Sequence, residues 1–181
     1  DISMIKKLMK MIAKEALHYF GAAATLAIVG CINMTVIMTL LSKFPHPIIV
    51  IGFVGIFVPL IEESARRYDV KFGGYTFTIL HILFESVERM PVVAGFGWLV
   101  FISVVLSRGI HLAFLKTSRQ KGLMAAVVLH GCWNMLFLTV NYFGEKLISE
   151  SNLIITLNVI AVIGAAYILT KKKQPVDKIE N

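Results

Sequence analysis

Residues 19–41 read YFGAAATLAIVGCINMTVIMTLL and contain no charged side chain. As an α-helix this stretch would be about 35 Å long, which is enough to cross the hydrocarbon core of a bilayer. A buried strand would not need so long an uncharged run. The stretch therefore predicts a membrane-spanning helix.

Five further apolar stretches follow along the chain. We expect spans at residues 47–66, 75–90, 92–115, 123–143 and 153–169. The span at 75–90 is the shortest of these. Hydrophobic residues make up 57% of the 181 residues and charged residues only 16%, which is too apolar for a soluble domain of this length. The predicted fold is an all-α, polytopic transmembrane bundle of about six spans.

The first 18 residues have a different pattern. Apolar residues recur there at helical spacing on one side of the predicted helix; they are Ile5, Leu8, Met9, Ile12 and Ala16. The other side carries the lysines Lys6, Lys7, Lys10 and Lys14. This pattern is typical of a basic amphipathic helix on an anionic lipid surface. We expect three parts: an interfacial helix at 1–18, one bundle domain at 19–170 and a basic cytoplasmic tail at 171–181.

The distribution of positive charge predicts the orientation. Basic residues collect before the first expected span and after the second, fourth and sixth, as at Arg66, Arg67, Lys116, Arg119 and Lys171. The positive-inside rule then places both termini in the cytoplasm, which agrees with an even number of spans. The net charge of +7 is explained by this topology, and no nucleic-acid partner is expected.

Ionisable residues inside membrane spans are costly and point to function. The polar residues within the expected spans are Glu62 and Glu63; His81, Glu85 and Glu88; Ser103, Ser107, Arg108 and His111; and His130, Asn134 and Asn141. Residues three, four or seven apart share one face of a helix, so three helices each present a polar stripe. We expect these stripes to line one cavity that opens towards the cytoplasm.

Such a set suits peptide hydrolysis. A carboxylate can take a proton from water, and histidines can orient that water or bind a metal ion. Histidine or asparagine donors can stabilise the oxyanion that develops during attack.

Short motifs among these residues resemble a known family. Glu62-Glu63-x-x-x-Arg67 resembles the EExxxR motif of the CPBP (Abi) superfamily of intramembrane proteases, which includes the type II CAAX prenyl endopeptidases. His130-Gly-Cys-Trp-Asn134 is similar to its HxxxN motif. His111 would be the histidine of the intermediate FxxxH motif, although Ser107 stands where phenylalanine is expected.

The related PrsW proteases offer a second likeness. Phe84-x-x-x-Glu88 is similar to their FxxxE motif, and Arg108-Gly-Ile-His111 to an RxxH element. Their first motif ends in a lysine two residues after the glutamate pair, where this chain has Ala65. The two resemblances cover the centre of the chain, from about residue 62 to residue 134.

The resemblance implies a bacterial or archaeal plasma-membrane endopeptidase that acts on a membrane-associated peptide or protein. It implies that Glu62 is the base, with Glu63 beside it in the site, that His111 orients water, and that His130 and Asn134 stabilise the oxyanion. The supporting residues would be Arg67, His81, Glu85, Glu88 and Arg108.

Other interpretations stay open. The two glutamates and Arg67 could form an interfacial cluster at a helix end, and His81 could serve only to hydrogen-bond Glu85. Glu85 and Glu88 could pair with Arg108 or Arg89 as packing elements. The whole polar core could belong to a non-catalytic scaffold, an immunity-type protein or a transporter-like binding site.

The sequence favours a mechanism without a metal ion. The usual zinc signature places two histidines on one helix around a glutamate, as in HExxH, and the chain has no such motif. If zinc is bound, the ligands would be Glu62, His111 and His130, because two histidines and a carboxylate leave one position open for water.

Overall fold

The computed structural model describes residues 2–44, 46–144 and 149–171. These residues form helices and short connections without strands, which confirms the all-α class. The helices are α1 (Ile2–Lys43), α2 (Pro47–Phe72), α3 (Thr76–Val93), α4 (Trp98–Ser107), α5 (Ile110–Lys121), α6 (Leu123–Gly144) and α7 (Glu150–Thr170). The expected tail beyond Lys171 lies outside the described residues.

Five helical segments of the described chain are long and apolar enough to cross a membrane. They are Ser3–Lys43, Pro47–Phe72, Trp98–Lys121, Leu123–Phe143 and Glu150–Thr170. Their length and composition indicate an integral membrane protein. Helix α3 is the expected span that does not reach this standard, since its 18 residues include Glu85, Glu88 and Arg89. A total of six spans therefore stays a prediction.

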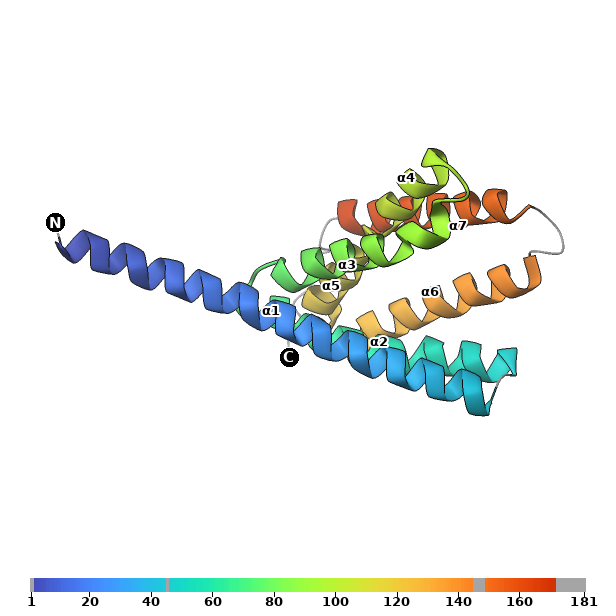
Figure 1. The fold of residues 1–181 in the computed structure, drawn as a ribbon, viewed down its shortest axis with the longest axis horizontal. Helices are drawn as coiled ribbons and strands as arrows, with labels where there is room; N and C mark the ends of the chain where they lie inside the picture. The colour runs from blue at the N-terminus through green and yellow to red at the C-terminus, as the bar shows by residue number, and fades with distance from the viewer. Residues whose placement is uncertain (1, 45, 145–148, 172–181) are drawn as a thin grey trace, which may run out of the picture.

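Helix α1 joins two segments that we expected to be separate. It runs without a break through residues 18 and 19, and its first buried residue is Ala22. The part before that point projects away from the other helices (Figure 1), and residues 3–17 are exposed. Contact of this part with lipid headgroups stays a prediction.

The expected span at residues 92–115 is interrupted. Helix α4 ends at Ser107 and α5 begins at Ile110, with Arg108 and Gly109 in the turn between them. The backbone N–H of Arg108 is shared between the carbonyl groups of Val104 and Val105, which is typical of a helix end. This turn brings the Arg108 side chain to α3.

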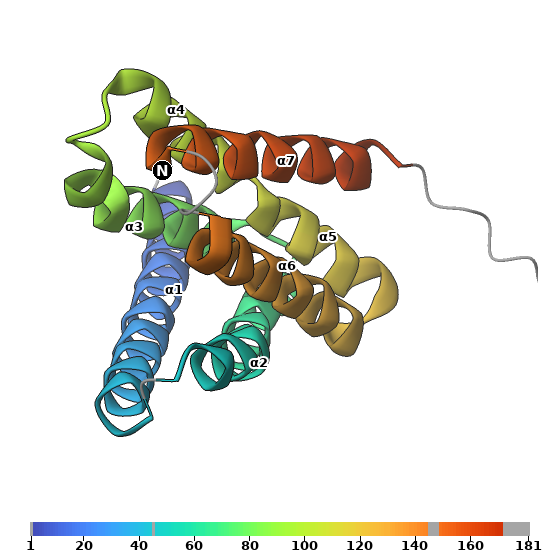
Figure 2. The ribbon, with the colours of Figure 1, turned by 90° about the vertical axis from the view of Figure 1, so that its right-hand side faces the viewer.

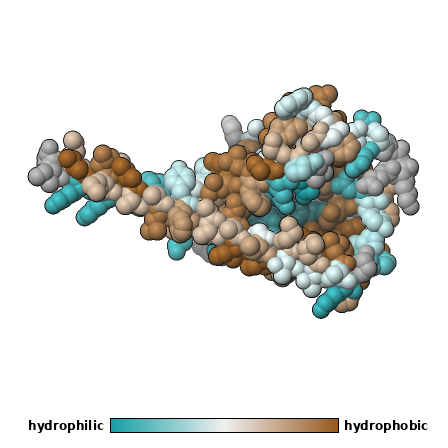
Figure 3. Space-filling model, in the orientation of Figure 1, coloured by the Kyte–Doolittle hydropathy of each residue, from teal (hydrophilic) through white to brown (hydrophobic). Residues whose placement is uncertain are grey.

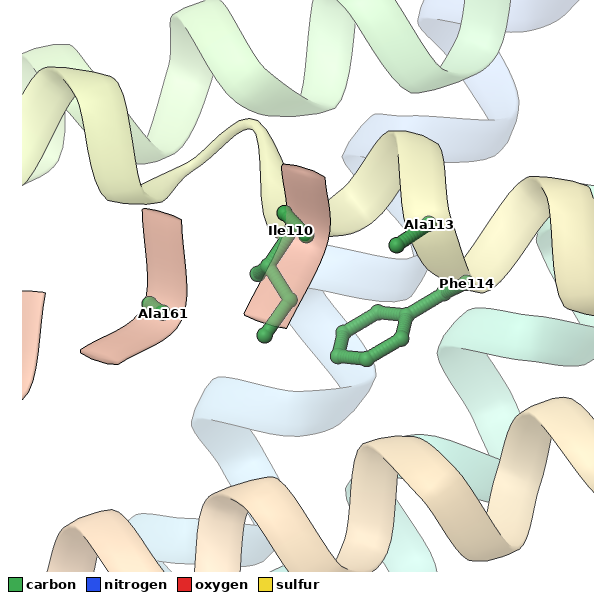
Figure 4. Packing of buried hydrophobic residues seen from close by; sticks show 5 residues of the cluster. Ile110, Ala113, Phe114 and Ala161 are labelled. Carbon is green, nitrogen blue, oxygen red and sulfur yellow. The ribbon is translucent and has the colours of Figure 1, made fainter. Parts of the chain in front are cut away.

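The helices pack in pairs around α5. Helix α2 packs mainly against α6, α4 packs against α7, and α5 contacts both α6 and α7 (Figures 1 and 2). The buried apolar cluster between α5 and α7 contains Ile110, Ala113, Phe114, Ala161 and Ala165 (Figure 4). Its alanines let the two helices approach closely.

Helices α2 and α6 approach through two glycines. A Cβ atom on Gly131 would overlap the backbone carbonyl oxygen of Gly55, and one on Gly55 would overlap the side chain of Met135. Only glycine permits this spacing. Because Gly131 follows His130, the contact brings that histidine against the polar face of α2.

Candidate functional site

The buried face of α2 carries the charged centre of the site. Glu62, Glu63, Arg66 and Asp69 are all buried, and Glu63 and Arg66 have no exposed surface. The Arg66 Nε atom donates to both carboxylate oxygens of Glu63 at 3.1 Å. A charged pair this far from water needs further hydrogen bonds, and neighbouring helices supply them.

Arg66 connects α2 to α3 and α5. Its Nη1 donates to Thr78 Oγ1 at 3.4 Å, and its Nη2 donates to His111 Nδ1 at 2.8 Å. Because a guanidinium group can only donate, His111 Nδ1 must be the accepting nitrogen. His111 Nε2 therefore carries the hydrogen and donates to Glu85 Oε2 at 2.8 Å. Both ring nitrogens of His111 are thus engaged.

Glu85 completes this part of the network on α3. Its Oε2 also accepts from Arg108 Nη1 at 3.0 Å. The side chains of Glu85 and Arg108 are 19% and 15% exposed, so the network reaches the surface here. The space-filling view shows a hydrophilic area in a hollow between hydrophobic flanks (Figure 3).

His130 is held from both sides on α6. Its Nδ1 donates to Glu63 Oε1 at 2.8 Å, and its ring stacks on Phe114 with centroids 4.4 Å apart and an angle of 17° between the planes. Since Nδ1 is the donor, Nε2 of the neutral ring bears a lone pair. That atom lies 3.7 Å from Glu62 Oε2.

Glu62 has a looser environment. Its Oε1 accepts from Asn33 Nδ2 at 2.9 Å, whereas its Oε2 lies 3.7 Å from the Nε2 atoms of both His81 and His130. His81 Nε2 is also 3.6 Å from Glu85 Oε1. Within the described residues, Asn33 Oδ1 and His81 Nδ1 are buried without a hydrogen-bond partner. Several polar atoms near Glu62, among them its own Oε2, therefore lack a direct hydrogen bond within the described residues.

Asp69 fixes the start of α3 against α2. Its two carboxylate oxygens accept from the backbone N–H groups of Phe77 and Thr78 at 2.9 and 2.7 Å. These groups belong to the first turn of α3, where amides lack partners within the helix and negative charge is favourable. The cap sets the position from which His81 and Glu85 reach the site.

The structure brings together seven of the ten predicted site residues. They are Glu62, Glu63, His81, Glu85, Arg108, His111 and His130. Arg67 and Glu88 are exposed and lie outside the network. Asn134 is half-buried, and the described chain offers it no hydrogen bond to the network.

Arg66 takes the place that we expected for Arg67. It shares the buried face of α2 with Glu62 and Asp69. Arg67 is about 100° further around the helix and points away from this face. The three- and four-residue separations of Arg66 from the two glutamates were a usable signal for its role.

Asn33 is a further site residue that the sequence analysis did not identify. A single amide in the apolar run of residues 19–41 was a signal for it, because polar side chains in a span usually face the bundle interior.

Three side chains could in principle hold a metal ion. Ligand atoms of Glu62, His81 and His111 lie within 4.8 Å of one another, so His81 stands here in place of the predicted His130. His111 could bind an ion only after releasing either Arg66 or Glu85, because both of its nitrogens are hydrogen-bonded. The donor set therefore fits a metal poorly in this arrangement.

No protein-family model, curated protein or solved structure matches this chain.

Proposed function

We propose that this protein is an intramembrane endopeptidase, similar to the CPBP and PrsW proteases, that hydrolyses a peptide bond of a membrane-associated protein or peptide. The observation that carries the proposal is the environment of Glu62 Oε2. Two imidazole Nε2 atoms from different helices each lie 3.7 Å from this buried carboxylate oxygen. A purely structural carboxylate would be expected to hold direct partners on both oxygens.

The separation suits a bound water molecule. A distance of 3.7 Å is too long for a direct hydrogen bond, and polar groups at this range are often bridged by water. Glu62 Oε2 and His130 Nε2 are both acceptors in the hydrogen-bonding state derived above. Water can donate a proton to each, which leaves its oxygen lone pairs directed away from both groups.

In the proposed reaction Glu62 is the general base. It takes one proton from water as the water oxygen forms a bond to the peptide carbonyl carbon. The resulting oxyanion accepts a hydrogen bond from His81 or from Asn134. His130, which the resemblance placed in this role, cannot supply it, because its Nε2 has no hydrogen to donate while Nδ1 donates to Glu63. The carbon–nitrogen bond then breaks as the proton on Glu62 passes to the leaving nitrogen, giving a carboxyl group and an amine.

The remaining residues would hold this centre in place. Glu63 and Arg66 orient His130, and Glu85 with Arg66 fixes His111 at the edge of the site. His111 therefore supports the site through its hydrogen bonds, in place of the direct contact with water that the sequence suggested.

We propose that this chemistry needs no metal ion. Activity should survive exhaustive chelation, and purified active protein should contain much less than one zinc per chain. One tightly bound zinc, with activity lost on its removal and restored on its return, would contradict this.

The proposal is tested with purified protein in lipid nanodiscs. Fluorescent single-span peptides are incubated in water enriched in heavy oxygen, and the fragments are analysed by mass spectrometry. Hydrolysis should place heavy oxygen in the new carboxyl terminus, and Glu62→Gln should abolish the fragments. Glu15→Gln, which changes an exposed glutamate of α1, is the matched control.

The absence of labelled fragments from every peptide would overturn the protease proposal. A peptide that binds equally well to wild type and to Glu62→Gln without being cleaved would instead favour the non-catalytic scaffold.

For the topology we propose six spans with both termini in the cytoplasm. Single cysteines at positions 145 and 172, introduced after removal of Cys31 and Cys132, should react with a membrane-impermeant maleimide from opposite sides. Labelling of both positions from the same side would contradict the proposed topology.

A further inference from the structure

We infer that Asn33 is a positioning residue that fixes the carboxylate of Glu62 for attack by water. The inference rests on the proposed protease function. It concerns a residue on α1, a helix that carries none of the motif residues discussed above.

Helix α1 contributes few buried side chains to the bundle. Among its described residues, only Ala22, Val29 and Asn33 are buried. Asn33 is the polar member of this narrow stripe, and its amide nitrogen donates to Glu62 Oε1 at 2.9 Å. The buried polar side chain of α1 therefore contacts the proposed base, Glu62.

This hydrogen bond makes the two oxygens of Glu62 unequal. Oε1 is held by Asn33, and no other direct hydrogen bond to Glu62 occurs in the described part of the chain. Oε2 is consequently the oxygen that faces His81 and His130. Without Asn33 the carboxylate could turn about its last side-chain bond, and neither oxygen would be held in a position facing His81 and His130.

Asn33 is costly to keep if its role is only structural. Its side chain is about nine-tenths buried, and its Oδ1 has no partner among the described residues. A buried polar atom without a hydrogen bond destabilises the folded protein. An apolar residue at position 33 would avoid this cost. The benefit of the asparagine is therefore the hydrogen bond from its amide nitrogen to Glu62.

Asn158 on α7 provides a matched control. It is also buried, its Nδ2 donates to Ser103 Oγ at 3.3 Å, and its Oδ1 likewise has no partner in the described residues. Its hydrogen bond joins α7 to α4 and does not involve Glu62. Replacing either asparagine by leucine removes the same chemical group from the interior of the bundle.

The first measurement is the cleavage of one fluorescent single-span peptide in nanodiscs. Asn33→Leu should lower kcat by about 10- to 100-fold, with KM changed by less than about threefold, because the base is misplaced while substrate binding is retained. Asn158→Leu should change kcat by less than about twofold. Equal losses in the two variants, or an unchanged kcat in Asn33→Leu, would overturn the inference.

The second measurement does not depend on turnover. The infrared carboxyl band of Glu62 is identified by subtracting the spectrum of Glu62→Gln from that of wild type. In Asn33→Leu this band should shift, because one of its oxygens loses a hydrogen bond, and in Asn158→Leu it should not. An unshifted band in Asn33→Leu would overturn the inference even if activity falls. A wild-type protein that cleaves no peptide would overturn the proposed function, and the infrared comparison would still decide whether Asn33 fixes Glu62.

Discussion

Glu62 and Glu63 are neighbours on α2 and both are buried, but their surroundings differ. Glu63 accepts two hydrogen bonds from Arg66 and one from His130, all within 3.1 Å. Glu62 accepts one from an amide and has two imidazole nitrogens at 3.7 Å. The first carboxylate has little capacity for anything further, whereas the second retains an oxygen that can interact with water. In the proposed mechanism this difference separates the supporting Glu63 from the reacting Glu62.

The largest effect on stability is expected from breaking the ion pair at Glu63. Arg66→Met should lower the free energy of unfolding by about 3–5 kcal/mol, because it leaves a buried carboxylate without its charged partner. The measurement is unfolding in mixed detergent micelles followed by tryptophan fluorescence.

Arg67→Met is the control for that experiment. Arg67 is exposed, so this variant should change stability by less than about 0.5 kcal/mol. A larger loss from Arg67→Met than from Arg66→Met would show that the motif arginine, and not its neighbour, holds the site.

A smaller effect is expected at the outer edge of the network. Glu85→Gln removes the negative charge that accepts hydrogen bonds from His111 and Arg108. Because hydrogen bonds to charged groups contribute about 1.5–3 kcal/mol, the variant should lower the free energy of unfolding by about that amount. Glu88→Gln changes an exposed residue one turn away and should have almost no effect. Thermal unfolding of the two variants in the same detergent checks this, and equal melting temperatures would remove Glu85 from the network.

The smallest effect on stability is expected at the contact between α2 and α6, which positions His130 beside Glu63. Gly131→Ala should cost about 1–3 kcal/mol, since the added methyl group would force α6 away from α2. Gly52→Ala is the control on α2, where a Cβ atom meets nothing within 4 Å. Unfolding free energies that are the same for both variants would contradict the close approach of the two helices.

The sequence predicted the helical class and most of the spans because long uncharged runs have few other structural explanations. It did not predict the break at Arg108 and Gly109, since a glycine inside an apolar run is common in membrane helices. It also did not predict that α1 is continuous, because the change from a basic to an apolar pattern alters the surroundings of a helix without ending it.

The site was predicted to the level of the helix and less well to the level of the side chain. Spacing placed His81 and Glu85 on one face correctly. It could not decide between Glu85 and Glu88, because the rotation of each helix is set by its packing against neighbours. The bonds from Asp69 to α3 and from Asn33 to Glu62 join separate helices, so spacing within one helix could not reveal them.

The most direct test compares Glu62→Gln with Glu63→Gln in peptide cleavage and in unfolding. Glu62→Gln should lower the cleavage rate by about two to four orders of magnitude while leaving the unfolding free energy within about 1 kcal/mol of wild type. Glu63→Gln should lower the unfolding free energy by about 3–5 kcal/mol, because Arg66 then lacks its carboxylate. Cleavage by Glu62→Gln at near the wild-type rate would contradict the account, whatever the stability of the two variants.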